Sequence, residues 1–267
     1  MVYITGDIHG NPLRILDMCQ QQNLRIHDVI VLLGDVGLNN DFGSRDREMK
    51  ECLSQEKPTI FCVHGNHEAR PQTVGTYKEK FWNGGRVLYE EAYPNLLFPV
   101  DGEIFTLEGH RCMVIGGAYS VDKPLRLAYG APWFPDEQPS AEIKAYVEQQ
   151  LRTNKVDVIF SHTCPYKYIP KEVFLPGIDQ STVDDSTERW LDTIEESTDY
   201  MLWFCGHWHT EKHIDRVHFL YRNIEILFYE LLVSACQKEH STAETTKTYT
   251  IDELDAILDE CINSVDG

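Results

Sequence analysis

The stretch "YITGDIHGN" (residues 3–11) joins a short apolar run to a polar turn that carries one carboxylate and one imidazole. Asn11 and Pro12 already make a good helix start, because Asn favours N-cap positions and Pro favours the first helical turn. Taken alone, Asp7 is more commonly explained by helix or turn capping than by chemistry. The stretch therefore predicts a strand, a turn and a helix in succession, and the later segments must show what Asp7 and His9 do.

Similar apolar runs recur along the chain and predict buried strands. They lie at residues 2–5, 28–33, 59–64, 111–118, 156–162 and 200–207, and helix-like segments lie at 12–22, 44–56 and 140–152. We expect Ser140 to open the last of these helices. The first third alternates strand and helix, as in an α/β sheet with covering helices. A long loop is expected over 119–139, and final strands over 214–230.

The composition limits the partners of this chain. Its 267 residues fit one large domain, and 24 Lys and Arg against 43 Asp and Glu give a net charge of −19. Such an acidic surface repels long nucleic acids and anionic lipid, so a phosphate-bearing ligand must meet a local positive site. The N-terminus lacks the pattern of a signal peptide and no apolar run spans a membrane, so we expect a cytoplasmic protein without a membrane partner. The eight cysteines form no CxxC pair, which favours free buried thiols.

Five short segments share one design, in which an apolar run ends, a small residue follows, and metal-ligating side chains come next. They are "GDIHG" (6–10), "LGDVG" (33–37), "HGNHE" (64–68), "FSHTCP" (160–165) and "CGHWH" (205–209). In an α/β sheet the carboxyl ends of the strands lie along one edge, so these segments converge there. The sequence therefore predicts a pocket lined by carboxylate, amide and imidazole groups.

The chemistry of these side chains favours two divalent ions. Mixed carboxylate, amide and imidazole ligands suit Mn²⁺, Fe²⁺, Zn²⁺ or Ni²⁺, and Mg²⁺ also remains open, whereas a thiolate-rich set would indicate structural zinc. Two metals together commonly serve phosphate-ester hydrolysis. Two carboxylates against two divalent ions leave a charge of about +2, which supplies the positive site that the acidic chain needs.

The ordered set GDxHG, GDxG, GNHE, SH and GHxH resembles the calcineurin-like metallophosphoesterases. The resemblance covers roughly residues 1–230. It implies an α/β/β/α sandwich, in which two mixed sheets are flanked by helices, and a metallophosphoesterase domain over residues 1–233. The domain would hydrolyse a phosphate mono- or diester by direct attack of a metal-bridging hydroxide.

The resemblance also implies roles for the residues of the five segments. Asp7, His9 and His209 would hold one metal, Asn66, His162 and His207 the other, and Asp35 would bridge them. His67 would stabilise the transition state or protonate the leaving oxygen. Alternation along extended strand ends would place Asp7 with His9, and His207 with His209, on common sides.

The substrate is open at this level. Arg126, Arg70 and Tyr119 are candidates for contacts with it, since Arg grips phosphate and aromatic rings stack on a base or ring. The chain lacks the GDxxDRG motif of protein serine/threonine phosphatases, so it departs from that subfamily. We expect a small phosphate ester or a phosphopeptide as substrate, and the oligomeric state is undecided.

Two other functions remain open. One is a non-catalytic interaction module of the same fold, although such proteins usually lose ligands and all seven positions are filled in this chain. The other is a nucleotide-directed nuclease or pyrophosphohydrolase, for which small nucleotides would escape the objection from the acidic charge.

The C-terminal part differs in composition. Residues 234–250 have the composition of a linker. Residues 251–263 follow with capping-box spacing and one apolar stripe, so they predict an acidic amphipathic helix. We expect this helix to dock on its own domain, and a role in partner binding or dimerisation is the alternative.

Overall fold

The computed structural model describes residues 1–241. The chain divides into two units, of which the first is Met1–Glu230, and the strands among the described residues belong to this first unit. They are β1 (Val2–Thr5), β2 (Val29–Leu32), β3 (Thr59–Cys62), β4 (Lys78–Trp82), β5 (Gly85–Glu90), β6 (Tyr93–Pro99), β7 (Ile104–Leu107), β8 (His110–Ile115), β9 (Val158–Ser161), β10 (Leu202–Cys205), β11 (Lys212–Ile214), β12 (Val217–Phe219) and β13 (Ile224–Ile226) in the described part of the chain. The α-helices are α1 (Leu13–Gln21), α2 (Ser44–Ser54), α3 (Lys123–Tyr129), α4 (Ala141–Thr153), α5 (Ser186–Ser197) and α6 (Leu227–Ser241). Short 3₁₀ helices are η1 (Pro71–Thr73), η2 (Tyr166–Tyr168), η3 (Lys171–Val173) and η4 (Gln180–Thr182).

The strands form two mixed sheets. The first has the order β13-β1-β2-β3-β6-β5-β4, and the second has the order β11-β12-β10-β9-β8-β7. The centre of each sheet is parallel: β1, β2, β3 and β6 run together in the first, and β12, β10, β9 and β8 in the second. The antiparallel strands lie toward the edges. The functional strands are therefore the parallel ones, whose carboxyl ends share one side of each sheet.

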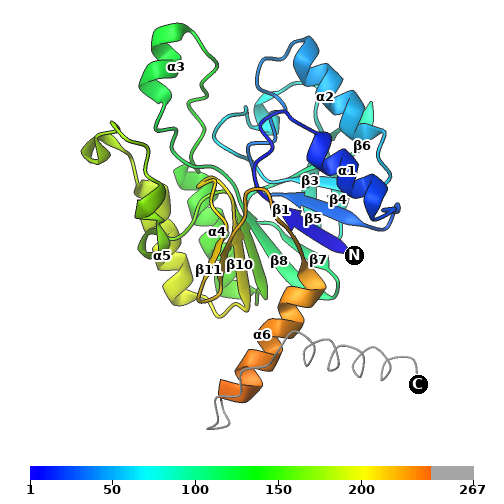
Figure 1. Cartoon of the computed structure of the whole chain (residues 1–267), viewed down its shortest axis with the longest axis vertical. Helices are drawn as coiled ribbons and strands as arrows, with labels where there is room; N and C mark the ends of the chain where they lie inside the picture. The colour runs from blue at the N-terminus through cyan, green and yellow to red at the C-terminus, as the bar shows by residue number, and fades with distance from the viewer. Residues whose placement is uncertain (242–267) are drawn as a thin grey trace. The chain divides into compact units, whose positions relative to one another are not determined.

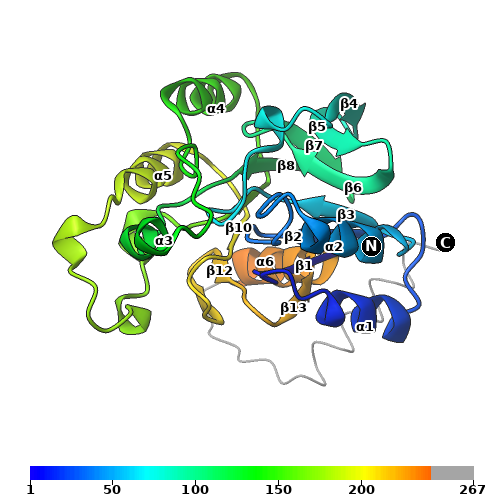
Figure 2. The ribbon, with the colours of Figure 1, turned by 90° about the horizontal axis from the view of Figure 1, so that it is seen from above.

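Helices cover the outer face of each sheet (Figures 1 and 2). Helices α1 and α2 lie beside the first sheet, and α4 and α5 lie beside the second. One apolar cluster joins α1 and α2 to the first sheet through residues such as Ile15 and Leu53. A second cluster joins α4 and α5 to the other sheet through residues such as Val147 and Leu191. The order of layers is helix, sheet, sheet, helix, as the resemblance implied.

The two sheets pack on each other through aromatic side chains. The rings of Phe61 on β3 and Phe105 on β7 have centroids 4.9 Å apart in an edge-to-face arrangement, and both residues are fully buried. This geometry is favourable for aromatic pairs, and burial of such large apolar surfaces holds the sheets together.

The predicted strands and helices are present with small shifts of their ends. Ser140 is the N-cap of α4, and its side chain accepts a hydrogen bond from the backbone N–H of Ile143. The loop predicted over 119–139 is only partly a loop, because α3 occupies Lys123–Tyr129 and ends at Gly130 in the left-handed conformation. Glycine reaches that conformation without steric cost, so it supplies the helix stop.

The expectations for residues after 226 need correction. The final strands end with β13, and residues 227–230 begin α6 instead of continuing a strand. Helix α6 also includes residues 234–241, where the sequence suggests the start of a linker. The rest of that linker and the amphipathic helix at 251–263 lie outside the described residues, so the helix and the boundary at 233 stay predictions.

The described residues bear on two expectations from composition, the absence of a membrane span and the free state of the cysteines. Within residues 1–241, no helix is both long and apolar enough to cross a membrane. The cysteines that the structure characterises are free thiols, and all but Cys52 are buried: Cys19, Cys62, Cys112, Cys164 and Cys205.

Candidate metal centre

The five segments meet because the strands before them are aligned. In the first sheet, Thr5, Leu32 and Cys62 are register partners at the ends of β1, β2 and β3. In the second sheet, Ser161 and Cys205 are partners at the ends of β9 and β10. The candidate ligands follow these positions within a few residues along the chain. Their side chains therefore gather at the carboxyl edge of both sheets.

Asp7, His9 and His209 form one group. The Nε2 atoms of His9 and His209 are 2.8 Å apart, and Nε2 of His209 lies 3.2 Å from Oδ2 of Asp7. The other oxygen of Asp7 accepts a hydrogen bond of 3.0 Å from the backbone N–H of His207. This bond fixes the Asp7 carboxylate, which is buried, and shows that Asp7 caps no helix.

Asn66, His162 and His207 form a second group. The Nδ1 atom of His162 is 2.7 Å from the carbonyl oxygen of Leu33, so Nδ1 carries the proton and Nε2 presents a lone pair. That lone pair lies 2.8 Å from Oδ1 of Asn66, whose Nδ2 donates to Oγ of Ser120. The ring of His207 lies near that of His162, with centroids 5.0 Å apart. Two acceptor atoms 2.8 Å apart repel each other unless a cation contacts both. Their position is therefore that of two metal ligands.

Asp35 lies between the two groups. Its Oδ2 is 3.9 Å from Nδ1 of His9, and its Oδ1 is 3.6 Å from Nε2 of His162. Asp7, Asp35 and His162 also each offer one ligand atom, and these three atoms lie within 4.8 Å of one another. The carboxylate of Asp35 thus reaches both sides, which is the geometry that a bridging ligand needs.

The backbone at this edge turns in the left-handed conformation, whereas the sequence predicts extended strand ends with alternating side chains. His9, Asp35, His207 and His209 all have positive φ, between 45° and 63°. Strands β1 and β10 end before the ligands begin, so strand alternation does not place them. Non-glycine residues in the left-handed region are strained and cluster at functional sites. Local turns therefore aim these side chains.

Glycines make the close approach possible. A Cβ atom on Gly34 would lie 2.1 Å from Nδ1 of His162, and one on Gly65 would lie 2.1 Å from the backbone nitrogen of Asp35. A Cβ on Gly206 would lie 2.4 Å from Oδ1 of Asp7. No side chain fits at these distances, so each glycine is needed for a candidate ligand to keep its position.

The electrostatics favour an ionised Asp7 and a neutral His207 at this edge, whereas they favour the protonated form of His209. Burial by itself would raise the pKa of Asp7, but the hydrogen bond from His209 and the charges of His162 and His9 lower it. The hydrogen bond to Asp7 raises the pKa of His209. Burial lowers the pKa of His207 well below its ordinary value, so its ring stays neutral. Ionised carboxylate and neutral imidazole are the forms that ligate metals.

The donor set fits divalent cations of the first transition row. Seven side chains offer oxygen and nitrogen atoms and no thiolate, which suits Mn²⁺, Fe²⁺, Ni²⁺ or Zn²⁺. The residues are Asp7, His9, Asp35, Asn66, His162, His207 and His209. The facing acceptor atoms of His162 and Asn66 support such a fit independently of the sequence motifs.

His67 and Arg126 lie beside the centre and contact each other. The backbone N–H of His67 donates to Oδ1 of Asp35 at 2.9 Å, and its Nε2 lies 3.6 Å from Oδ2 of the same residue. The guanidinium of Arg126 contacts the imidazole at Nδ1, and Asp122 holds Arg126 at 2.7 Å. Burial and the Arg126 charge outweigh the Asp35 carboxylate and lower the pKa of His67.

Arg70 is engaged in a buried ion pair. Arg70 is buried, and its Nη1 forms an ion pair with Oδ2 of Asp101 at 2.5 Å. Its Nε also donates to the carbonyl oxygen of Asp136. Since the guanidinium is held in this buried pair, these contacts give no support for a role in substrate binding.

Two residues support the centre without being predicted as part of it. Glu68 accepts hydrogen bonds from the backbone N–H groups of Gly65 and Gly37, both at 3.1 Å, and ties two of the five segments together. Ser120 orients the amide of Asn66. No motif singles out Ser120, whereas Glu68 belongs to GNHE and its turn contacts could be anticipated.

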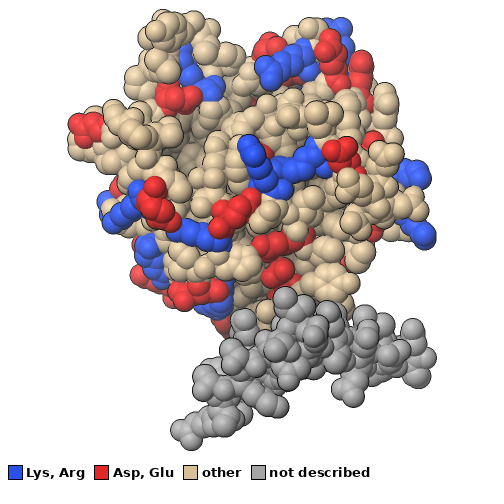
Figure 3. Space-filling model, in the orientation of Figure 1, with Lys and Arg blue, Asp and Glu red and all other residues tan. Residues whose placement is uncertain are grey.

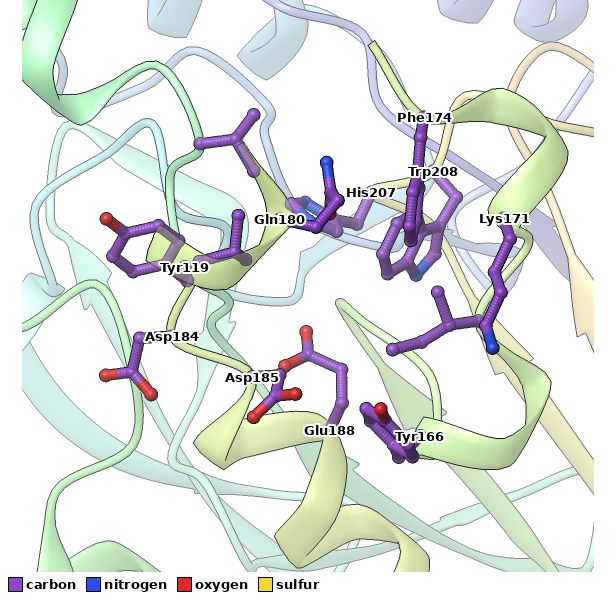
Figure 4. A pocket seen from close by; sticks show the side chains of 13 residues that line it. Tyr119, Tyr166, Lys171, Phe174, Gln180, Asp184, Asp185, Glu188, His207 and Trp208 are labelled. Carbon is purple, nitrogen blue, oxygen red and sulfur yellow. The ribbon is translucent and has the colours of Figure 1, made fainter. Parts of the chain in front are cut away.

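A cavity of about 320 Å³ opens beside the centre. Its lining includes His207 and Trp208 from one side and Tyr119 from another (Figure 4). Tyr119 was a candidate substrate contact, and the structure brings it to this cavity. Much of the remaining lining comes from residues 166–188, a stretch of 3₁₀ turns and loop with no periodic pattern to identify it in the sequence.

A family model and several solved structures are similar to this chain. The family model described as "Calcineurin-like phosphoesterase" matches residues 1–211. A search of curated proteins finds no match. The solved structure of TT1561 of Thermus thermophilus is 13% identical with a TM-score of 0.48, covering 84% of this chain and 96% of that one. The phosphopantetheinyl hydrolase PptH from Mycobacterium tuberculosis is 14% identical with a TM-score of 0.39, covering 82% and 87%.

Proposed function

This chain belongs to the calcineurin-like phosphoesterase family, and we propose that it hydrolyses a phosphate mono- or diester with two divalent metal ions. Members of this family are in general phosphoester hydrolases. The observation that carries the proposal is the meeting of seven oxygen and nitrogen donors at one sheet edge, with facing acceptor atoms such as Nε2 of His162 and Oδ1 of Asn66.

We assign the ligands as two groups that share one carboxylate. Asp7, His9 and His209 would hold one ion, Asn66, His162 and His207 would hold the other, and Asp35 would contact both. When bound, two such ions hold the phosphoryl oxygens and lower the pKa of water so that hydroxide is present near neutral pH. The identity of the ions depends on availability, and Mn²⁺ is our first choice for assay.

The chain's own residues would bind and orient the ester. Arg126 contacts His67 directly, and its guanidinium can pair with phosphoryl oxygens. His67 lies at the edge of the centre with 24% of its side chain exposed, so a substrate can reach it. We propose that the imidazole donates a proton to the leaving oxygen or stabilises charge there.

The charge distribution favours a small substrate. On the face drawn in Figure 3, Lys and Arg alternate with Asp and Glu, and the described residues show no continuous basic track there. Long nucleic acids need many phosphate contacts with such a track. A small phosphate ester or a phosphopeptide fits better, with the positive charge supplied at the metal centre.

The test is a hydrolysis screen with metal analysis. Purified protein would be loaded with Mn²⁺, Ni²⁺, Mg²⁺ or Zn²⁺ and assayed on aryl phosphate monoesters and diesters. His67→Ala should lower turnover by about 10²- to 10⁴-fold while the metal content stays unchanged, as expected for a general acid. Asp35→Asn should lower the metal content itself.

His27→Ala is the control, because His27 is exposed and lies outside the five segments. This variant should retain both metal and turnover. Wild-type protein with full metal and no turnover on a broad panel of phosphate esters would contradict the proposal and would favour a non-catalytic interaction module.

A further inference from the structure

The cavity beside His207 is not used by the metal chemistry proposed for this chain. Its volume of about 320 Å³ is near the lower end of ligand sites, which span roughly 300 to 1,000 Å³. It has room for one ring system of a small ligand. A phosphate held at the metal centre would therefore place the organic part of its ester at the mouth of this cavity.

Aromatic side chains form much of its wall. The rings of Trp208 and Phe174 are stacked, with centroids 6.0 Å apart and an interplanar angle of 28°. Tyr119 lies across the cavity from them, and Tyr166 lies below (Figure 4). Flat π-faces on two sides favour a planar ring as occupant, because stacking suits aromatic pairs better than contact with a flexible chain.

One buried carboxylate enters the same cavity with an unused acceptor. Glu188 on α5 is 4% exposed, and its Oε1 accepts a hydrogen bond of 2.8 Å from Thr163. Within the described residues, Oε2 accepts no side-chain hydrogen bond from another residue. Figure 4 shows the carboxylate directed into the space between Tyr119 and Trp208. Burial raises the pKa of Glu188 to about 7, because the ionised carboxylate is poorly solvated there. An N–H donor from a ligand would stabilise the buried acceptor with a hydrogen bond.

The neighbouring acids are already engaged. Asp185 forms two hydrogen bonds with Arg189, at 2.7 and 2.8 Å. Asp184 accepts hydrogen bonds from Gln138 and from the backbone of Ser186. Glu188 is therefore the carboxylate available to a ligand.

We propose that this cavity binds an aromatic ring that bears N–H donors, the chemistry of an aminated nucleobase, as the organic part of a small phosphate ester. Trp208, Phe174 and Tyr119 would contact the ring, and Glu188 would accept from its amino group. The inference rests on the proposed phosphoesterase function and specifies its substrate class as a small nucleotide.

The first experiment measures binding without metal. Protein treated with EDTA would be titrated by calorimetry with adenosine, with purine riboside, which lacks the 6-amino group, and with ribose. Adenosine should bind about 10-fold more tightly than purine riboside, as expected for one additional hydrogen bond. Ribose should show no measurable binding. Equal affinity for adenosine and ribose would overturn the inference.

Substitutions at Glu188 and Phe174 test the two halves of the site. Affinity for adenosine should fall in the order wild type, Glu188→Gln, Glu188→Ala, because the amide still accepts but without charge. Affinity for purine riboside should stay nearly constant along this series. Phe174→Ala should weaken both purines. The controls are Glu196→Gln, an exposed residue of α5, and Phe81→Ala, whose side chain is 77% exposed on β4.

Hydrolysis then separates this inference from the general function. Adenosine 5′-monophosphate and ribose 5-phosphate have similar leaving groups, so their ratio of kcat/KM reports the ring contact. A ratio above about 10 that falls by about 10-fold in Glu188→Ala, as the loss of one hydrogen bond predicts, would support the site. Turnover of both esters at equal rates, or a preference for alkyl over aromatic esters, would overturn it while the phosphoesterase function stands. Purine binding without turnover of any ester would instead overturn the function.

Discussion

Gly65 shows how tightly single residues constrain the centre. A Cβ at this position would meet the backbone nitrogen and Oδ1 of Asp35, both at 2.1 Å. Backbone cannot move aside as a flexible side chain can, so the shared carboxylate itself would be displaced. The same reasoning applies to Gly34, whose Cβ would collide with His162.

We predict that Gly65→Ala loses metal binding and stability together. The clash should cost a few kcal/mol, about 1–3 as for overpacking elsewhere in protein cores. Metal content by elemental analysis and the midpoint of urea unfolding would measure both effects. Gly75→Ala is the matched control, since a Cβ there meets nothing within 4 Å. Normal metal content in Gly65→Ala would show that the backbone at this edge yields to a methyl group.

Arg126 offers a second prediction at the scale of one residue. Its guanidinium contacts the ring of His67 and is held by Asp122. If it also binds phosphoryl oxygens, Arg126→Ala should lower kcat/KM by about 10- to 100-fold, the effect of losing a hydrogen bond to a charged group. Arg126→Lys should recover only part, because Lys lacks the planar fork.

Steady-state kinetics on a phosphate monoester would test this role, with kcat and KM determined separately. Arg152→Ala is a suitable control, because the Arg152 side chain is 71% exposed on α4. Unchanged kinetics in Arg126→Ala would assign the contact with His67 to packing alone.

At the scale of elements, three short strands are joined by a cluster of two imidazoles and one carboxylate. Nε2 of His213 on β11 lies 2.7 Å from Oε1 of Glu225, and Nδ1 of His218 on β12 lies 2.8 Å from Oε2. Glu225 itself is on β13, which pairs with β1 in the other sheet. The carboxylate therefore ties the edge hairpin of the second sheet to the edge of the first.

The pH dependence of stability should reveal the contribution of the contacts between Glu225 and the two histidines. Burial alone would raise the pKa of Glu225, but hydrogen bonds and charges from His218 and His213 lower it. A folded-state pKa below the unfolded value of about 4.3 gives stability that is present above that pH and is lost as pH falls through the folded value. Glu225→Gln should therefore be less stable than wild type at pH 7.

The two proteins should converge in stability only below the folded-state pKa of Glu225, which lies under the unfolded value of about 4.3, since the wild-type carboxylate is then protonated in both states. Urea unfolding at a series of pH values would follow the difference. Glu196→Gln, an exposed substitution on α5, should show no such dependence. Parallel curves for Glu225→Gln and wild type across this range would contradict the assignment.

At the scale of the whole molecule, the metal centre joins segments from both sheets. Asp7, Asp35 and Asn66 follow strands of the first sheet, whereas His162, His207 and His209 follow strands of the second. A ligand that binds only the folded state stabilises it by mass action. Bound metal should therefore act as a clamp between the sheets.

We predict that EDTA lowers the melting temperature and that Mn²⁺ restores it. At 100 times the dissociation constant the stabilisation should be about 2.7 kcal/mol. Calcium should stabilise less, because it prefers sites made of oxygen ligands alone. Asp35→Asn should largely lose the effect in the same thermal melts. A melting temperature that changes with neither EDTA nor Mn²⁺ would argue against any metal at this edge.

The sequence by itself determined the elements and the chemistry of the candidate ligands. Apolar runs located the parallel strands β1, β2, β3, β8, β9 and β10 but not β6. Ser140 located the start of α4, and five ordered motifs named the donors. These features are local, since periodicity, caps and motifs depend on residues close together in the chain.

Only the tertiary structure decided which side chains meet and how. Positive φ at His9 and Asp35, instead of strand alternation, sets their direction. The pairing of Arg70 with Asp101 and the entry of Glu188 into a cavity beside His207 join residues that no pattern connects. The physical reason is that such contacts depend on how segments far apart in the chain pack together. Patterns over neighbouring residues do not tell which of these segments lie close in space.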